Sequence, residues 1–277
     1  MKKIQFVWIF IFFCISCSDH DYVEEYEREE IRDSVVLREP EDSTKSTSND
    51  STVEEKSFSV LGNSISTYSG YIPNGYSNYY TPSRLSVEDT WWMQLSAKED
   101  FELSSNASWS GSAVINSSNK SQDSYFTAEG RLIALSEKGV PDIILILGGT
   151  NDWGDNTGFL GDYPMGENYN LKTFRGAYSY LVVRLKDLYP NASIICCSIL
   201  PRKQSRTQKN NYGMTQLEID ESISYIANIY NVYFVDVSVC GLEKNIGGLT
   251  LDGLHPNKAG MKVIADYLYG KLKSLSF

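Results

Sequence analysis

Short apolar runs alternate with longer amphipathic segments from Phe58 to the end of the chain, and this alternation restricts the possible folds more than any other feature. The apolar runs have the length of buried strands, and the segments between them have the spacing of helices. The predicted strands cover residues 58–61, 101–103, 143–147, 193–199 and 232–237, and the predicted helices cover residues 87–97, 125–137, 172–188, 212–230 and 256–272. Strands that alternate with helices pair in parallel and are covered on both faces. The pattern therefore predicts a three-layer α/β/α sandwich with about five parallel strands.

The first 17 residues have the pattern of an export signal. Lys2 and Lys3 give a charged start, residues 4–15 are mostly apolar, and Ser16 and Cys17 close the segment. The apolar run is short for a membrane span. A cysteine after a small residue resembles the site at which bacterial lipoproteins are cleaved and acylated, and the alternative is an ordinary cleaved signal peptide. We expect an exported protein, lipid-anchored through Cys17 to a bacterial membrane, periplasmic or at the cell surface.

Residues 18–57 differ in composition from the rest of the chain. They are charged, rich in Ser and Thr and poor in large apolar side chains, so they cannot bury enough surface to offset the entropy of ordering. Most of the formal charge of −10 falls here, and the remaining residues show no basic stripe of the kind that binds nucleic acid. We predict a flexible acidic tether over residues 18–57, a folded domain over residues 58–277 and no nucleic-acid partner.

Four polar sequence blocks lie where predicted strands end. They are residues 61–66 (LGNSIS), 106–111 (NASWSG), 148–152 (GGTND) and 252–256 (DGLHP). The first three follow the first three predicted strands, and the fourth lies between the last strand and the last helix. The carboxyl ends of parallel strands meet at one edge of a sheet, where the reactive crevice of such folds lies. We therefore expect the four blocks to come together at that edge.

In this order the four blocks resemble those of the SGNH (GDSL-type) hydrolases, over almost the whole predicted domain. Each block alone is common, but four in order, each at a predicted strand end, form a specific pattern. The resemblance implies the flavodoxin-like SGNH hydrolase fold and an enzyme that hydrolyses acyl esters. It implies that Ser64 is the nucleophile, His255 its base, and Asp252 the residue that orients the base. It also implies an oxyanion hole made by the backbone N–H groups of Ser64 and Gly111 and the side-chain amide of Asn151.

The histidine content supports the same base. The chain has two histidines, and His20 lies in the predicted tether, which leaves His255 as the imidazole of the domain. A carboxylate three residues earlier, Asp252, can accept the Nδ1 proton, fix the tautomer and stabilise the imidazolium. The alternative is that residues 252–256 are only a turn before a helix with Pro256 in its first turn, and that Ser64 is only a turn or N-cap serine.

The residue before the serine departs from the family pattern. The family usually has aspartate there, and this chain has Asn63. That aspartate transfers no proton in the family mechanism, and asparagine is nearly isosteric and can hydrogen-bond locally in a tight turn. We expect activity to survive this change of charge beside Ser64.

Motifs of other enzyme classes are missing from the sequence. Ser66 breaks the G-x-S-x-G pattern of α/β-hydrolases, and neither a Walker A motif nor a dinucleotide-binding glycine fingerprint occurs. A single histidine in the domain provides no cluster for catalytic zinc, so we predict no metal and no cofactor. The cysteines of the domain, Cys196, Cys197 and Cys240, are expected to be small buried hydrophobic residues.

Two long loops, residues 66–86 and 153–170, are rich in aromatic residues and should overhang the crevice. Trp109, Trp153 and Tyr68 are the candidates for stacking on a sugar, and the alternative is that such rings pack the loops themselves. An exported, tethered enzyme without a long apolar lid suits deacetylation of polysaccharides or glycosides. A lipase, lysophospholipase or thioesterase-like acylhydrolase is the second hypothesis. A surface glycan-binding protein with vestigial catalytic blocks is the third.

Overall fold

The computed structural model describes residues 55–117, 119–155, 157–275 and 277. The chain divides into two units, residues 1–50 and 51–277, and all described residues belong to the second unit. The predicted signal segment with Cys17 and nearly all of the predicted tether therefore lie outside the described residues. Within the described part, no helix is long and apolar enough to span a bilayer.

Five parallel strands form the sheet. They are β1 (Lys56–Gly62), β2 (Phe101–Asn106), β3 (Ile143–Leu147), β4 (Ser193–Cys197) and β5 (Tyr233–Val235). Their order is β2-β1-β3-β4-β5, and every neighbouring pair is parallel. All five residues of the central strand β3 are buried, as expected for an apolar run covered on both faces. The predicted α/β fold with about five parallel strands is confirmed.

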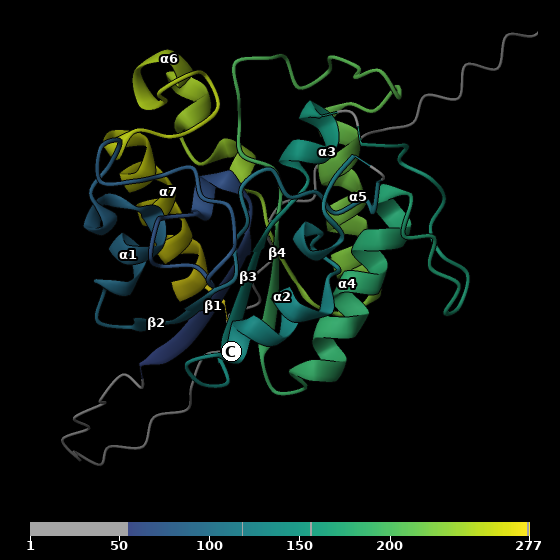
Figure 1. The fold of residues 1–277 in the computed structure, drawn as a ribbon, viewed down its shortest axis with the longest axis horizontal. Helices are drawn as coiled ribbons and strands as arrows, with labels where there is room; N and C mark the ends of the chain where they lie inside the picture. Colours follow the sequence, from purple (N-terminus) through teal and green to yellow (C-terminus); the bar gives the residue numbers. More distant parts are fainter. Residues whose placement is uncertain (1–54, 118, 156, 276) are drawn as a thin grey trace, which may run out of the picture. The chain divides into compact units, whose positions relative to one another are not determined.

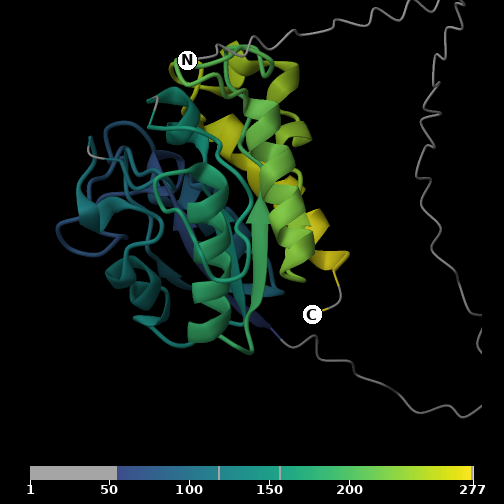
Figure 2. The same ribbon diagram turned by 90° about the vertical axis from the view of Figure 1, so that its right-hand side faces the viewer.

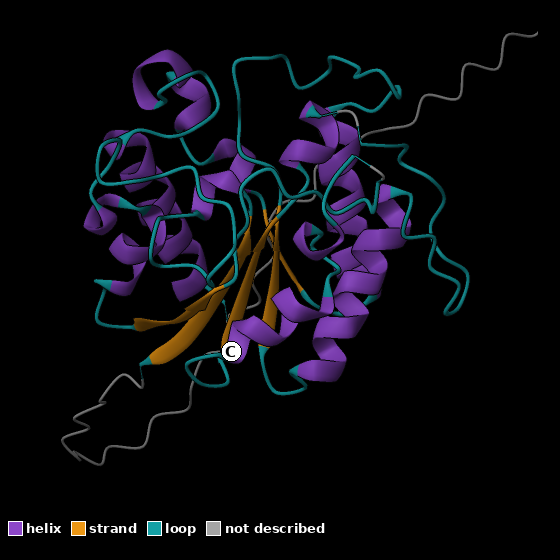
Figure 3. Ribbon diagram, viewed as in Figure 1, coloured by secondary structure: helices purple, strands orange, loops and turns teal. Residues whose placement is uncertain are grey.

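Helices cover both faces of this sheet (Figures 1 and 2). The α-helices are α1 (Trp91–Ser96), α2 (Glu129–Ile133), α3 (Thr150–Gly154), α4 (Phe174–Leu188), α5 (Gln216–Ile229), α6 (Ile246–Leu249) and α7 (Lys258–Lys273). One buried core lies between the sheet and α1 with α7, and a second lies between the sheet and α2, α4 and α5. Figure 3 shows the strands between these two groups of helices, with long loops gathered beyond one end of the strands. These two cores hold the sheet edge on which the polar blocks lie.

Several helices begin or end differently from the prediction. The predicted helices over residues 87–97 and 212–230 are the shorter α1 and α5. The predicted helix over residues 125–137 is the short α2 followed by a 3₁₀ turn, Ala134–Ser136. The last helix begins at Lys258, so Pro256 is not in its first turn. Asn257 is the N-cap instead, because its side chain accepts a hydrogen bond of 3.0 Å from the N–H of Gly260.

The strand order reverses between β1 and β3, and this reversal determines where a crevice can form. From β1 the chain crosses to β2 on one side and later returns to β3 on the other side. The connections at the carboxyl ends of β1 and β3 therefore lead away in opposite directions and leave space between them. Ser64 follows β1 and Asn151 follows β3, so both lie at this position.

The three cysteines of the domain are buried and unpaired. Cys196 and Cys197 are neighbours on β4, and their side chains belong to the two different cores, one on each face of the sheet. Burial raises the pKa of Cys196 to about 12 and that of Cys240 to about 11. Such thiols stay protonated and pack as small apolar groups.

Candidate active site

Ser64 lies on a tight turn directly after β1. The turn is the 3₁₀ segment Ser64–Ser66, and the side-chain oxygen of Asn63 caps it by accepting the N–H of Ile65 at 3.1 Å. The amide nitrogen of Asn63 donates to the carbonyl of Leu147, at the end of β3, at 3.3 Å. Asn63 thus uses both an acceptor and a donor, which an ionised aspartate could not do. This side chain ties the serine turn to the neighbouring strand.

His255 and Asp252 reach Ser64 from the segment before α7. The Nε2 atom of His255 lies 2.9 Å from the Oγ atom of Ser64, and its Nδ1 atom lies 2.7 Å from Oδ2 of Asp252. The other carboxylate oxygen, Oδ1, accepts the N–H groups of Leu254 at 3.0 Å and His255 at 2.8 Å. Hydroxyl, imidazole and carboxylate therefore form one continuous chain of hydrogen bonds between segments that are 191 residues apart.

Tyr79 covers the imidazole on one side. Its ring stacks on that of His255 with centroids 3.5 Å apart and planes 9° apart, and its hydroxyl donates to Oδ2 of Asp252 at 3.1 Å. The guanidinium carbon of Arg84 lies 4.2 Å from the Tyr79 ring centroid, and the same group donates to the Tyr79 carbonyl at 2.9 Å. The ring therefore restricts the imidazole to the plane in which it meets both of its partners.

The surroundings shift the pKa values of the pair in a direction that suits a general base. Burial lowers the pKa of His255, and the nearby charges of Arg84 and Arg202 lower it further, against the opposing effect of Asp252. Burial alone would raise the pKa of Asp252, but hydrogen bonds from the N–H and side chain of His255, its charge and the N–H of Leu254 lower it to about 2. The imidazole is therefore neutral and the carboxylate ionised near pH 7.

Two further residues named from the sequence, Gly111 and Asn151, lie in the segments that follow β2 and β3. Gly111 has a φ of 76°, a left-handed conformation that favours glycine, and a Cβ placed on it would meet no atom within 4 Å. Asn151 is in the first turn of α3 and is almost fully buried. Its side-chain nitrogen donates to the carbonyl of Ser112 at 2.7 Å. An amide nitrogen carries two N–H bonds, so one more donor is present beyond that contact.

A buried arginine lies beneath the turn of Ser64. Arg131 on α2 has no exposed surface, and its guanidinium donates to the carbonyls of Gly62 at 2.7 Å, Ala107 at 2.9 and 3.1 Å, and Ser124 at 2.7 Å. In the described part of the chain its acceptors are all backbone carbonyls. Burial lowers the pKa of Arg131 to about 9, which leaves it charged near neutral pH. One side chain thereby joins the carboxyl ends of β1 and β2.

A buried aspartate, Asp152, binds backbone N–H groups, as Arg131 binds backbone carbonyls. Asp152 has no exposed surface, and its two oxygens accept the N–H groups of Val114 at 3.0 Å and Ile115 at 2.8 Å. Burial raises the pKa of Asp152 to about 6, although these N–H groups and the hydroxyl of Thr157 counteract the rise. Asp152 thus fixes the segment that follows Gly111 to the helix that carries Asn151.

The structure places the three predicted substrate-stacking rings in different surroundings. Trp109 is half-buried on the loop that leads to Gly111 and packs on Tyr76, with ring centroids 4.3 Å apart. Trp153 is only 5% exposed, and its indole N–H donates to the carbonyl of Gln208 at 3.0 Å. Tyr68 is 4% exposed, and its hydroxyl donates to the carbonyl of Leu85 at 3.0 Å. Trp153 and Tyr68 therefore pack the interior and cannot stack on a bound sugar, whereas Trp109 can.

Tyr79, Arg131 and Asp152 were not predicted from the sequence to support the site. Tyr79 lies in the aromatic loop over residues 66–86, but loop position alone does not show which of its rings faces His255. Arg131 and Asp152 bind backbone groups, which every residue has, so no side-chain partner in the sequence marks them. Only Asp152 carries a signal in the sequence, which is its position directly after Asn151 in the third block.

The arrangement can carry out acyl transfer. A neutral imidazole can remove the hydroxyl proton of Ser64, and the resulting alkoxide can attack an ester carbonyl. Ser64, Gly111 and Asn151 lie on the segments that follow β1, β2 and β3, and N–H donors of this kind can stabilise a tetrahedral oxyanion. Among residues 55–277, apart from the three not described, no cluster of three or more His, Cys, Asp or Glu is arranged to hold a metal ion.

Comparison with known proteins identifies the family. Residues 56–272 match the family described as GDSL-like lipase/acylhydrolase. This chain belongs to that family. No curated protein matches the sequence. The GDSL-like acylhydrolases are enzymes, so the hydrogen-bonded serine, histidine and aspartate lie in a hydrolase domain that spans nearly all described residues.

Solved structures with the same fold include three bacterial proteins. A protein described as a GDSL-like lipase from Bacteroides ovatus is 27% identical, with a TM-score of 0.61 over 80% of this chain and 100% of that chain. A similar protein from Bacteroides uniformis is also 27% identical, with a TM-score of 0.62 over 80% and 97% of the two chains. A family two carbohydrate esterase from Clostridium thermocellum, 18% identical with a TM-score of 0.53 over 79% and 64%, shares the fold alone. The GDSL-like fold of this acylhydrolase is therefore established.

Proposed function

We propose that this GDSL-like acylhydrolase is a serine esterase that removes acyl groups, acetyl above all, from carbohydrates. Ser64 is the nucleophile, His255 the general base and Asp252 the orienting carboxylate. The single observation that supports this proposal best is the pair of contacts of His255, 2.9 Å to the Ser64 hydroxyl and 2.7 Å to Asp252. The first contact lies in the distance range that general-base catalysis requires, and the second lets Asp252 orient the imidazole and stabilise the imidazolium.

The reaction follows from these contacts in two acyl-transfer steps. Nε2 of His255 takes the proton of Ser64 as Oγ attacks the ester carbonyl, and N–H donors at Ser64, Gly111 and Asn151 stabilise the oxyanion. When the tetrahedral intermediate collapses, the C–O bond to the sugar breaks and the imidazolium returns the proton to the sugar oxygen. Water then attacks the acyl-enzyme with the same base, and the acid leaves while Ser64 regains its proton.

The carbohydrate part of the proposal rests on the surface near the oxyanion loop. Half-buried Trp109 packs on Tyr76 there, and both rings line an open groove together with amide and hydroxyl side chains. Sugars present apolar C–H faces and many hydroxyl groups. Aromatic rings can pack on the C–H faces, and amide and hydroxyl side chains can hydrogen-bond the hydroxyl groups. A long acyl chain would require a continuously apolar lining.

The test is hydrolysis by the purified protein and by a serine variant. We expect Ser64→Ala to lower turnover of p-nitrophenyl acetate by about 10⁴-fold or more, because removing one triad member removes covalent catalysis. Ser69→Ala changes an exposed serine of the same loop and should leave turnover unchanged. Near-normal hydrolysis by Ser64→Ala would refute the proposed nucleophile.

A substrate panel tests the acyl group and the alcohol separately. Acetylated xylan, acetylated glucomannan, p-nitrophenyl acetate and p-nitrophenyl palmitate are compared at equal ester concentration. We expect the acetyl esters to be hydrolysed faster than the palmitoyl ester. A preference for the palmitoyl ester would favour a lipase-type acylhydrolase, and binding of glycans without hydrolysis would favour a non-catalytic protein.

We also propose that the protein is exported and anchored through a lipid on Cys17. The charged start, the mostly apolar residues 4–15 and the serine before Cys17 support this proposal. In a bacterial host that carries out lipoprotein processing, labelled palmitate should be incorporated into the wild-type chain and not into Cys17→Ser. Equal labelling of both chains would overturn the anchor.

A further inference from the structure

A large groove among the described residues lies beside the loop that carries Gly111 and is lined by none of the three residues of the hydrogen-bonded triad. Its volume is about 1450 Å³. That exceeds the range of roughly 300–1,000 Å³ that pockets for compact small molecules occupy. The groove can therefore hold a ligand longer than one sugar.

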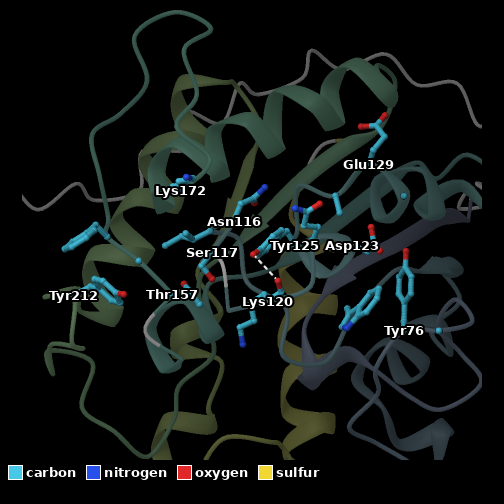
Figure 4. A pocket seen from close by; sticks show the side chains of 18 of the residues that line it. Tyr76, Asn116, Ser117, Lys120, Asp123, Tyr125, Glu129, Thr157, Lys172 and Tyr212 are labelled. Carbon is cyan, nitrogen blue, oxygen red and sulfur yellow. Dashed lines mark hydrogen bonds between the residues drawn. The ribbon is translucent and has the colours of Figure 1, made fainter.

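Aromatic pairs line both ends of this groove. Tyr76 and Trp109 form one pair, and Phe159 and Tyr212 form the other, with ring centroids 4.8 Å apart at 80°. Figure 4 shows Tyr76 and Tyr212 at opposite sides of the cavity. Phe159 is 60% and Tyr212 is 39% exposed, although large apolar rings are normally buried in a folded domain. Exposed rings at the two ends of one groove are suited to packing against successive units of a chain.

Polar side chains lie between the two aromatic pairs. Asn116, Ser117 and Lys120 face the cavity in Figure 4, and Gln122 also lines it. Amides and hydroxyls can donate or accept hydrogen bonds with sugar hydroxyls, and an ammonium group can donate them. An acyl chain would remove these groups from water without offering them a hydrogen bond, which is unfavourable. The middle of the groove therefore disfavours a long lipid tail.

The charges around the groove balance. Lys120 and Lys172 line it together with Asp123 and Glu129. Lys120 forms an ion pair with Asp155, and Glu129 forms one with Arg184. A groove with two cations and two carboxylates has no excess charge with which to attract a polyanion. Its ligand is expected to be uncharged.

Some residues that line the groove lie close in the chain to Gly111 and Asn151, the two proposed oxyanion donors outside the serine turn. Trp109 precedes Gly111 by two residues on the loop that Asp152 fixes, and Thr157 and Phe159 lie on the segment that follows α3, which carries Asn151. A ligand in the groove therefore contacts the same segments that hold the oxyanion donors. Binding there can place a neighbouring part of the ligand at Ser64.

We propose that this groove binds an uncharged oligosaccharide chain several sugars long, with the aromatic pairs at its ends packing against sugar rings. The proposal rests on the function proposed above and deepens it: the substrate is an acylated neutral polysaccharide, and the groove holds sugars next to the one that carries the ester. The enzyme then prefers polymeric over monomeric esters.

Binding is measured first without turnover, so that it does not depend on the esterase proposal. The full-length Ser64→Ala protein is run in affinity electrophoresis gels that contain acetylated glucomannan or acetylated xylan, beside gels with polygalacturonate. We expect at least one neutral polysaccharide to retard the protein and polygalacturonate not to do so. Adding Tyr212→Ala or Phe159→Ala should weaken retardation at least about fivefold, as loss of an aromatic contact does. Tyr225→Ala, which removes a similarly exposed tyrosine that does not line the groove, should have no effect.

A chain-length series supplies the catalytic readout. For the protein with an intact Ser64, kcat/KM is compared between an acetylated xylohexaose and an acetylated xylose. We expect a ratio of about ten or more, which falls toward one in Tyr212→Ala.

The two proposals fail in distinguishable ways. Retention by none of the neutral polysaccharides, or retention that both ring variants leave unchanged, overturns the groove even if Ser64-dependent acetate release is normal. Preferential retention by polygalacturonate, or binding of lysophosphatidylcholine micelles that Tyr212→Ala abolishes, also overturns it. Glycan binding that depends on Tyr212, without Ser64-dependent hydrolysis of any ester, supports the groove and overturns the esterase.

Discussion

The groups on the two sides of Ser64, the proposed oxyanion donors on one and His255 with Asp252 on the other, are held in place in different ways. On the oxyanion side, the charged groups that hold the backbone, Arg131 and Asp152, have no exposed surface and bind only backbone carbonyls or N–H groups and one hydroxyl. On the histidine side, the side chain of Asp252 is 45% exposed, and the ring that covers His255 is itself covered by Arg84. The oxyanion side is therefore fixed by charged groups that are buried away from water, whereas the histidine side remains in contact with water.

This difference separates two properties that active-site variants usually change together. Buried charges on backbone groups determine where the N–H donors point, so changes there should lower turnover without moving its pH dependence. Charges around a partly solvated imidazole determine its proton affinity, so changes there should move the pH dependence and affect maximal turnover little. Variants on the two sides of Ser64 therefore test whether turnover and its pH dependence can be changed separately.

Of the variants on the two sides of Ser64, the largest effect is expected for Asn151, the proposed oxyanion donor. In Asn151→Ala the side-chain amide is lost, and turnover of p-nitrophenyl acetate should fall by about 10²–10³-fold, the usual effect of removing one such donor. The midpoint of the acidic limb of the pH–rate profile should stay where it is in the wild-type protein. A shift of that midpoint would contradict the separation of the two sides.

Arg131 should have the next largest effect. Arg131→Met leaves the carbonyls of Ala107 and Ser124 without their buried donor, at about 1–3 kcal/mol for each such acceptor, whereas the carbonyl of Gly62 retains the N–H of Trp109. We expect turnover to fall by about 10- to 100-fold, with a lower melting temperature. Arg184→Met removes an exposed, paired arginine and serves as the matched control, with a change within about 0.5 kcal/mol. If Arg131→Met does not fold, Arg131→Lys, which keeps the charge with fewer donors, should show the same loss to a smaller degree.

The histidine side should respond in its pH dependence. Because the pKa of His255 is lowered, the neutral base persists below the ordinary value of 6.5, and the acidic midpoint of kcat/KM should lie below that pH. Arg84 lowers this pKa, so Arg84→Met favours the protonated imidazole and should move the midpoint upward. Turnover at pH 8 should stay within about threefold of wild type. A midpoint that is unchanged or moves downward in Arg84→Met would count against this assignment.

The smallest effect is expected from Asn63→Asp, which restores the residue usual in the family. The aspartate keeps the acceptor for Ile65 but loses the donor to Leu147. Because Asn63 does not contact the proton-transfer chain, turnover should change by no more than about threefold. A tenfold gain or loss in steady-state kinetics would show that charge beside Ser64 matters more than the local turn does.

The sequence predicted the sheet because it depends on local patterns, and the resemblance of the four blocks to a known family indicated Ser64, Asp252 and His255, which the structure places in one chain of hydrogen bonds. Strand-length apolar runs give the sheet, and Ser64 and His255 lie in short blocks that adjoin strands or helices. It failed for Tyr68 and Trp153, because proximity along the chain to Ser64 or Asn151 does not reveal whether a ring points inward or outward. Arg131 could not be predicted as a support of the site, because its partners are carbonyls that only the folded chain brings together.

The carboxylate of Asp252 organises its own four-residue turn as well as the imidazole, so the base and its orienting group form a locally assembled piece. The contact of His255 with Ser64 and the contacts of Tyr79 with His255 and Asp252 depend instead on how this turn packs against a distant part of the chain. If this turn moved slightly away from Ser64 on warming, turnover would stop while every helix and strand persisted. Heat inactivation should therefore precede the loss of the circular dichroism signal.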